Sequence, residues 1–345
     1  MTDHMLEDRV RKIIGDDRLD ASAKDQALAA LIDTRIDQFG NFIFVRKGAP
    51  LDARDLTPFD RVNVLELRDR KRPAKRAKFL DKLNAHPPYS GPIILAEGDS
   101  WFEYPWFNIP DLLDRAGDKY AVLSLARAGD TWSDILDQDS NPPRTYPDGS
   151  LMGLFHTLAA PAPRPFQYVM LSVGGNDLVG SLIDCVYDFD INRPGDEYIK
   201  HTGSNGRPGF DDVLGAALYR YREATSKLVA AGQHVILHNY DYPNPVQNGQ
   251  YIGYQLKKYH QIDGEGLMRQ ILNQMIDLFH DGLKKIADTS NQIHLIDFRN
   301  TIGTDDYVAG PDQTLWNDEM HGNAAGFKKL WTKMDDELAK IFAQA

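Results

Sequence analysis

The chain has 345 residues, 42% of them hydrophobic and 26% charged, which is the composition of a globular protein with one large domain or two. Its formal net charge of −11 at pH 7 disfavours nucleic acid and anionic membranes as partners. A single cysteine, Cys185, excludes an internal disulfide and any multi-cysteine metal site, and we expect it to be a partly buried hydrophobe.

The N-terminal sequence predicts neither a signal peptide nor a membrane anchor. Residues 1–17, MTDHMLEDRVRKIIGDD, mix acids and bases without a continuous apolar stretch. No later segment is apolar and long enough to cross a bilayer. A cytoplasmic location is therefore expected, although a secretion route that reads no N-terminal signal would leave the same sequence.

Residues 1–85 are predicted to form a smaller, mainly helical region whose role the sequence does not reveal. Residues 23–39, AKDQALAALIDTRIDQF, have apolar residues at helical spacing. Residues 65–83 carry a basic run that could contact nucleic acid, but a solvated helix face with Leu and Phe packed inward is the favoured interpretation. We expect this region to pack on the rest of the chain or to form a protein interface. Residues 86–92, HPPYSGP, are typical of a linker.

From residue 92 to the end, five apolar runs alternate with helical segments. The runs are PIILAEG, YAVLSLA, FQYVMLSVG, QHVILHNY and QIHLIDF. Strands this apolar are covered on both faces, so residues 92–345 are predicted to form an open α/β domain with a parallel sheet. Two connections, about 184–208 and 241–266, are longer than a strand-to-helix link needs. Their tyrosines and isoleucines favour packed covers over the site.

Polar residues gather where these predicted strands end. Ser100 follows the first strand, Gly129 the second and Asn176 the third, while Asp318 and His321 follow a long excursion after the fifth. A serine hydroxyl is a poor nucleophile and needs a base within hydrogen-bonding reach, and imidazole suits that task because it titrates near neutrality. An aspartate three residues before the histidine can hold the other ring nitrogen. The pattern predicts a Ser–His–Asp triad at one edge of the sheet.

The same edge offers donors for a negatively charged oxygen. Gly129 has no side chain, so its N–H can approach closely, and Asn176 supplies a side-chain amide. The N–H of Ser100 would be the third donor of this oxyanion hole. The candidates for lining the substrate pocket are Trp101, Phe102, Asp177 and Tyr240.

Other catalytic arrangements fit the sequence less well. The nucleophile elbow of α/β-hydrolases needs a glycine two residues after the serine, where this chain has Phe102. His234, His238, His294 and Asp297 could ligate a metal, but they lie within or beside apolar strand runs, where core or strand-end histidines are the favoured interpretation. We therefore expect neither a metal nor another cofactor.

Four sequence blocks together resemble the SGNH (GDSL-type) hydrolase superfamily: Gly-Asp-Ser at 98–100, the glycine of RAGDT, GGND at 174–177 and Asp-x-x-His at 318–321. The resemblance extends from about residue 92 to the end. It implies a flavodoxin-like three-layer α/β/α fold with a five-stranded parallel sheet, and hydrolysis of esters, lipids or acylated carbohydrates. The aromatic stretch SWFEYPWF after the nucleophile departs from many members, which weakens any analogy of substrate.

The expected function is that of a serine esterase or lipase-type hydrolase, which cleaves a small-molecule ester or acylated substrate through an acyl-enzyme on Ser100. An acyltransferase or a carbohydrate O-deacetylase could use the same site. A non-catalytic binding or regulatory protein that keeps the fold is the alternative from another class.

Overall fold

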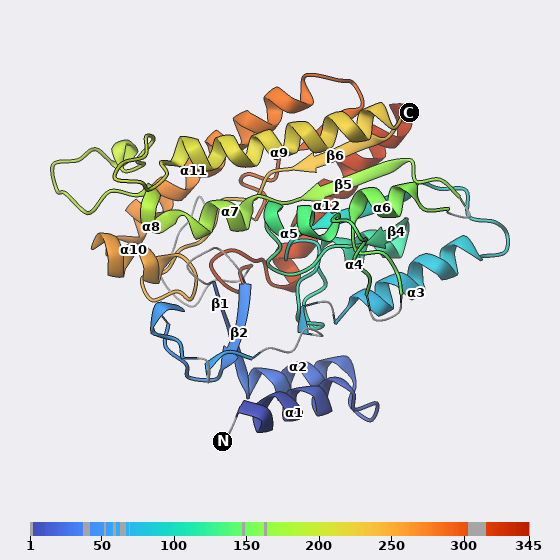
Figure 1. Ribbon diagram of the computed structural model, residues 1–345, viewed down its shortest axis with the longest axis horizontal. Helices are drawn as coiled ribbons and strands as arrows, with labels where there is room; N and C mark the ends of the chain where they lie inside the picture. The colour runs from blue at the N-terminus through green and yellow to red at the C-terminus, as the bar shows by residue number, and fades with distance from the viewer. Residues whose placement is uncertain are drawn as a thin grey trace.

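A five-stranded parallel sheet forms the centre of the computed structural model (Figure 1). The structure describes residues 3–36, 42–51, 53–57, 60–62, 67–68, 70–146, 149–161, 164–302 and 315–344. The strands are β3 (Ile93–Gly98), β4 (Ala121–Ser124), β5 (Tyr168–Ser172), β6 (His234–His238) and β7 (Ile293–Ile296). Their order, β4-β3-β5-β6-β7, is that of a flavodoxin-like sheet. The predicted strands and the fold implied by the resemblance are confirmed.

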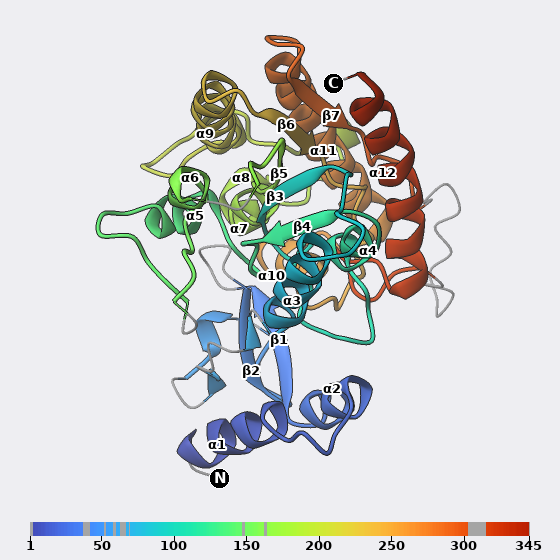
Figure 2. The ribbon, with the colours of Figure 1, turned by 90° about the vertical axis from the view of Figure 1, so that its right-hand side faces the viewer.

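Helices cover both faces of this sheet (Figure 2). Helices α4 (Leu112–Lys119) and α12 (Ala324–Gln344) pack together on one face. On the other face, α9 (Phe210–Ala230) packs against α11 (Glu265–Ala287). All residues of β3, β4 and β5 are buried, because apolar side chains on both sides of each strand meet a helical layer. The shorter helices are α5 (Trp132–Gln138), α6 (Leu154–Ala159), α7 (Gly175–Gly180), α8 (Leu182–Cys185) and α10 (Gly253–His260).

Two capping boxes fix where the loops beyond β3 and β4 end. The Asp111 carboxylate accepts the Asp114 N–H at the start of α4, and Asp114 accepts the Asp111 N–H in return. Thr131 and Asp134 make the same reciprocal pair at the start of α5. Such pairs satisfy N–H groups that the first helical turn leaves without partners. The loops that carry Ser100 and Gly129 therefore run between a strand end and a capped helix.

The N-terminal region is helical, as predicted, and also contains a hairpin. Its elements are α1 (Asp3–Ile14), α2 (Ala21–Ala29), the antiparallel pair β1 (Ile32–Ile36) and β2 (Phe42–Arg46), the 3-10 turn η1 (Ala53–Asp55) and α3 (Arg72–Leu83). In both views the hairpin lies between α1–α2 and the large domain (Figures 1 and 2). The prediction of one helix over 23–39 is wrong for β1, and residues 37–39 lie outside the described residues. The boundary between residues 85 and 92 stays a prediction.

Helix α3 also corrects the interpretation of the basic run. The helix begins at Arg72 with Pro73 in its first turn, a position that tolerates proline because no intrahelical N–H bond is needed there. Lys71, Arg72 and Lys75 are buried. The expectation of a solvated basic face is therefore wrong for these three side chains, two of which pair with carboxylates of the large domain.

The two long connections contact each other. The first, 184–208, contains the 3-10 turn η4 (Gly195–Glu197), and the second, 241–266, contains α10. The Phe189 N–H donates to the His260 carbonyl at 2.7 Å. Cys185 is buried, as expected, and burial raises the pKa of its thiol to about 12. Within the described residues, none of the helices has both the length and the hydropathy of a bilayer-spanning segment.

Candidate active site

Ser100, His321 and Asp318 form one hydrogen-bonded series. The Oγ of Ser100 lies 2.7 Å from Nε2 of His321, although 221 residues separate them in the chain. Nδ1 of His321 lies 2.9 Å from both carboxylate oxygens of Asp318. Burial alone would raise the pKa of the Asp318 carboxyl, but His321 and two backbone N–H groups lower it below its ordinary value. An ionised Asp318 favours the tautomer whose Nδ1–H points to it, which leaves Nε2 free to accept the Ser100 proton.

The turn that carries Ser100 is held by its neighbour Asp99. This buried carboxylate accepts the Trp101 N–H and the Ser172 hydroxyl, each at 3.0 Å, and also the Tyr240 hydroxyl. Burial raises the pKa of Asp99 to about 6, although these hydrogen bonds act to lower it. A Cβ on Gly98 would lie 2.3 Å from the Ser172 carbonyl oxygen, so the corner requires glycine. The position of the serine thus depends on β5 as well as on β3.

The other two predicted oxyanion residues, Gly129 and Asn176, lie on the segments next to this turn. The Arg127 N–H donates to the Gly98 carbonyl at 2.9 Å, so the chain before Gly129 runs beside the Ser100 corner. Gly129 has φ +80°, a left-handed conformation that favours glycine. Asn176 lies in the first turn of α7, and its Nδ2 donates to the Asp130 carbonyl at 3.0 Å. An amide has two N–H bonds, so this contact leaves one for a ligand.

Two tyrosines that the sequence analysis did not single out contact the candidate catalytic histidine, His321. The rings of Tyr104 and Tyr251 have centroids 4.7 Å and 6.3 Å from that of His321. The Tyr104 hydroxyl donates to Asp318 at 2.9 Å, and burial raises the pKa of this phenol well above its ordinary value, so it stays a donor. The only sequence signal for Tyr104 is its place four residues after Ser100, within the aromatic stretch SWFEYPWF.

An apolar cavity of about 60 Å³ opens beside Ser100, Asn176 and His321. Its walls come mainly from α7, α8 and α11: Leu178, Val179, Leu182, Leu272, Met275 and Ile276. Trp101 and Tyr240 line the cavity as expected candidates. The other two candidates do not. Phe102 is fully buried against the His238 ring, and Asp177 lines a separate depression with Trp132.

Of the two long connections, only the second reaches this cavity among the described residues. Residues 241–266 contribute Asp241, Pro243 and Ile252 to its lining. The first connection turns outward, where the Gln274 side chain on α11 donates to the Asp196 carbonyl at 3.1 Å. Residues 184–208 therefore do not line this cavity in the described structure.

Glu319 links the second long connection to the candidate triad through hydrogen bonds. The residue lies between Asp318 and His321 in the chain and is 3% exposed. It accepts four backbone N–H groups, from Val246, Tyr251, Ile252 and Gly253, at 2.7 to 3.2 Å. The connection that contributes to the cavity lining is thus bound directly to the loop that carries His321. No local sequence pattern indicates this contact, because it joins residues about 70 positions apart.

The residues weighed as metal ligands lie in the sheet and its edge. His234 and His294 contact each other at 3.2 Å, and the Asp297 carboxylate binds Arg299. His238 is buried, which lowers the pKa of its imidazole to about 4, and its Nδ1 lies 2.7 Å from the Asn239 carbonyl oxygen. Within the described part of the chain, no group of three or more His, Cys, Asp or Glu side chains is placed to hold a metal ion.

Comparison with known proteins gives structural similarity only. No family model and no curated protein sequence matches the chain. A Streptococcus pneumoniae protein assigned provisionally as a platelet activating factor is 15% identical, with a TM-score of 0.43, covering 78% of this chain and 92% of its own. A Slackia heliotrinireducens protein assigned provisionally as an SGNH hydrolase is 16% identical, with a TM-score of 0.41 and coverages of 72% and 100%. A variant of an acetylxylan esterase from Geobacillus stearothermophilus is 14% identical, with a TM-score of 0.41, covering 72% of this chain and 94% of its own.

Proposed function

We propose that the chain is a serine hydrolase that cleaves carboxylic esters through an acyl-enzyme on Ser100. The observation that carries this proposal is the unbroken contact series from the Ser100 hydroxyl through His321 to Asp318, with distances of 2.7 Å and 2.9 Å. A buried serine and histidine in this arrangement have the geometry that nucleophile activation requires.

In the proposed reaction, Nε2 of His321 takes the Ser100 proton as Oγ attacks the ester carbonyl carbon. The carbonyl oxygen becomes an oxyanion, which accepts hydrogen bonds from the free N–H of Asn176 and the backbone N–H groups of Gly129 and Ser100. The tetrahedral intermediate collapses when the carbon–oxygen bond to the alcohol breaks, and His321 gives its proton to the leaving alcohol. Water then attacks the acyl-enzyme with the same proton transfers, which releases the acid and restores Ser100.

The cavity supports a short apolar acyl group as the part of the substrate held next to Ser100. Its volume of about 60 Å³ is several times what one water needs, roughly 10–15 Å³, but well below the roughly 150 Å³ that holds benzene. The walls are leucine, valine, isoleucine and methionine side chains, so they favour hydrocarbon over a polar acyl group. An acyl chain of about two to four carbons fits these limits.

The test combines a fluorophosphonate probe with hydrolysis of p-nitrophenyl esters. The unmodified chain should be labelled at Ser100 and should hydrolyse the acetate and butyrate esters. Ser100→Ala and His321→Ala should each remove nearly all turnover, and the double variant should be little worse than either, because the two residues act as a unit. Ser181→Ala, which changes a serine that bonds the Asp177 carbonyl, is the matched control and should retain activity. An unlabelled Ser100 in an otherwise folded chain would contradict the proposal.

A further inference from the structure

Three basic side chains of the N-terminal region reach the loops that carry the candidate catalytic residues. We call Arg68 together with residues 70–75 the anchor segment; it ends in the first turn of α3 and contributes Arg68, Lys71 and Lys75. Two loops of the large domain receive these side chains. The nucleophile loop is residues 99–111, between β3 and α4, and the oxyanion loop is residues 125–131, between β4 and α5.

Arg68 holds the oxyanion loop on both sides of Gly129. Its Nε donates to the Ala128 carbonyl at 2.9 Å, and its Nη2 donates to the Asp130 carboxylate at 2.8 Å. The backbone carbonyl of Asp130 in turn accepts the Nδ2 of Asn176 at 3.0 Å. One guanidinium therefore fixes the residue before Gly129 and the residue after it, and through Asp130 it also orients the amide of Asn176. Two of the three proposed oxyanion donors, Gly129 and Asn176, therefore depend on this single side chain.

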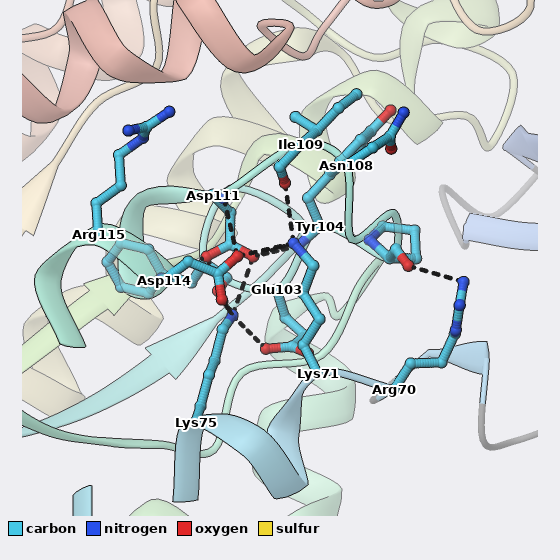
Figure 3. Close-up of polar contacts among 12 residues, drawn as sticks. Arg70, Lys71, Lys75, Glu103, Tyr104, Asn108, Ile109, Asp111, Asp114 and Arg115 are labelled. Atoms are coloured by element: carbon cyan, nitrogen blue, oxygen red, sulfur yellow. Dashed lines mark hydrogen bonds and ion pairs between the residues drawn. The ribbon is translucent and has the colours of Figure 1, made fainter. Parts of the chain in front are cut away.

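Lys71 and Lys75 hold the nucleophile loop (Figure 3). The Nζ of Lys75 donates to the Phe102 carbonyl at 2.8 Å and to the Glu103 carboxylate at 2.6 Å. Lys71 donates to the Ile109 carbonyl at 2.9 Å, and both lysines contact Asp111, which caps α4. Burial opposes the charge of Lys75, but the neighbouring carboxylates raise its pKa above the ordinary value. The loop is thus clamped within two residues of Ser100 and again at its far end.

Stability alone is a weak reason for such a cluster. Buried ion pairs lose much of their Coulomb attraction to desolvation, and well-packed apolar side chains of similar size often stabilise a protein as much or more. Side chains that bond backbone carbonyls, however, fix the path of a loop more narrowly than apolar packing does. Ala128, Phe102 and Ile109 each offer a carbonyl to the anchor segment. The contacts therefore restrict where the two loops can lie relative to each other.

We propose that the anchor segment is the positioning element of the active site, and that Arg68 is the positioning residue of its oxyanion hole. This inference rests on the proposed ester hydrolysis at Ser100 and gives a role to the N-terminal region. Arg68 touches neither substrate nor the reacting atoms. It acts through Gly129 and Asn176, whose donors must meet the oxyanion within a fraction of an ångström. A displacement of about 1 Å at such a site can cost about 10²-fold in rate.

The experiment compares Arg68→Met, Arg68→Lys and the control Arg46→Met in the full chain. Arg46 pairs with the buried Asp60 inside the N-terminal region, so the control also leaves a buried carboxylate without its arginine. The measurements are kcat and KM for p-nitrophenyl acetate, with active sites counted by fluorophosphonate titration, and the Tm of each variant. Counting sites separates a slower enzyme from a smaller folded fraction.

Arg68→Met should lower kcat per titrated site about 10-fold or more, with KM changed less than about threefold, because the lost interaction serves mainly the transition state. Arg68→Lys should recover part of kcat, since one ammonium can reach Asp130 or Ala128 but not both. In an Asn176→Ala background, Arg68→Met should have a smaller effect on kcat, because one of the two donors that Arg68 positions is already missing. Arg46→Met should change Tm and leave kcat unaltered.

If Arg68→Met has a kcat per titrated site within about twofold of that of the unmodified chain, the inference is overturned and the proposed function still stands. Should Arg68→Met fail to fold, Arg68→Lys decides: a lower kcat at unchanged Tm supports the inference, and an unchanged kcat overturns it. An unmodified chain that neither reacts with the probe nor hydrolyses esters would overturn the proposed function, and the inference with it.

Discussion

Replacing Glu319 by glutamine should release residues 246–253, the segment that contributes Ile252 to the cavity lining. Glutamine has nearly the same shape, but its NH₂ group replaces one of the two oxygens. Each oxygen of Glu319 accepts two backbone N–H groups, Val246 and Gly253 on one, Tyr251 and Ile252 on the other. Whichever oxygen the NH₂ group replaces, two backbone N–H donors then face another donor. The N–H groups of Tyr251, Ile252 and Gly253 are buried, and that of Val246 is partly buried.

The expected cost follows from that count. A buried donor left without its acceptor costs about 1–3 kcal/mol, so Glu319→Gln should destabilise the local closed state by about 2–6 kcal/mol. Relaxation offers little relief, because a Cβ on Gly249 would lie 2.0 Å from the carboxyl carbon of Glu319, which shows how tightly the loop surrounds this side chain. The lower bound of about 2 kcal/mol corresponds to about 30-fold more frequent opening of the segment.

Hydrogen exchange measured by mass spectrometry reads this opening directly. The amides of Tyr251, Ile252 and Gly253 should exchange about 30-fold faster or more in Glu319→Gln, while amides of the central strand β5 should change less. Glu265→Gln is the matched control, because Glu265 lies in the same connection and accepts the Gln247 N–H at 2.9 Å. Equal exchange rates in Glu319→Gln and the unmodified chain would refute the reasoning, since the four bonds would then contribute nothing to closure.

Three further outcomes are expected. Asn176→Ala should lower kcat for p-nitrophenyl acetate about 10²-fold or more with little change in KM; a rise in KM alone would make Asn176 a binding residue. Met275→Ala should enlarge the cavity and move the preference across a p-nitrophenyl ester series to longer acyl chains, at a cost of about 2–5 kcal/mol in stability, whereas an unaltered profile would remove α11 from the acyl site. Burial raises the pKa of Asp177 to about 6, so the folded state holds a proton that the unfolded state loses, and stability should fall by about 3 kcal/mol as pH rises from about 4 to 6. Asp177→Asn should flatten the dependence of Tm on pH in that window, and an unchanged slope would disprove the assignment.

The sheet and the arrangement of the candidate triad follow from patterns that are local in sequence. Five apolar runs of strand length fix a parallel sheet, and parallel strands bring their carboxyl ends to one edge, so Ser100 and Asn176 were expected there together. Asp318 and His321 share a short-range motif that can be read without knowing the fold. These inferences needed only periodicity and chain order.

The support around the site could not be derived in this way. Arg68 binds residues about 60 positions away, and the Thr34 hydroxyl in the N-terminal hairpin contacts that of Tyr251, 217 positions away. No local pattern encodes such pairs, because many lysines and arginines in an ordinary sequence are solvated. The helix expected at 23–39 is present as far as Ala29 and is wrong at β1 for a different reason. In Ile32–Ile36 β-branched residues alternate with polar ones, a period of two that the apolar residues before it obscured.

The buried thiol of Cys185 makes the protein convenient for single-site spectroscopy. The chain has one cysteine, and burial together with the raised thiol pKa keeps it from forming the thiolate that maleimides and iodoacetamides need. A dye or spin label could therefore be placed by one exchange, Ile191→Cys, at a side chain that is 82% exposed on the first long connection, without first removing a native thiol. With a second probe on α1, the distance between the N-terminal region and that connection could then be measured in solution.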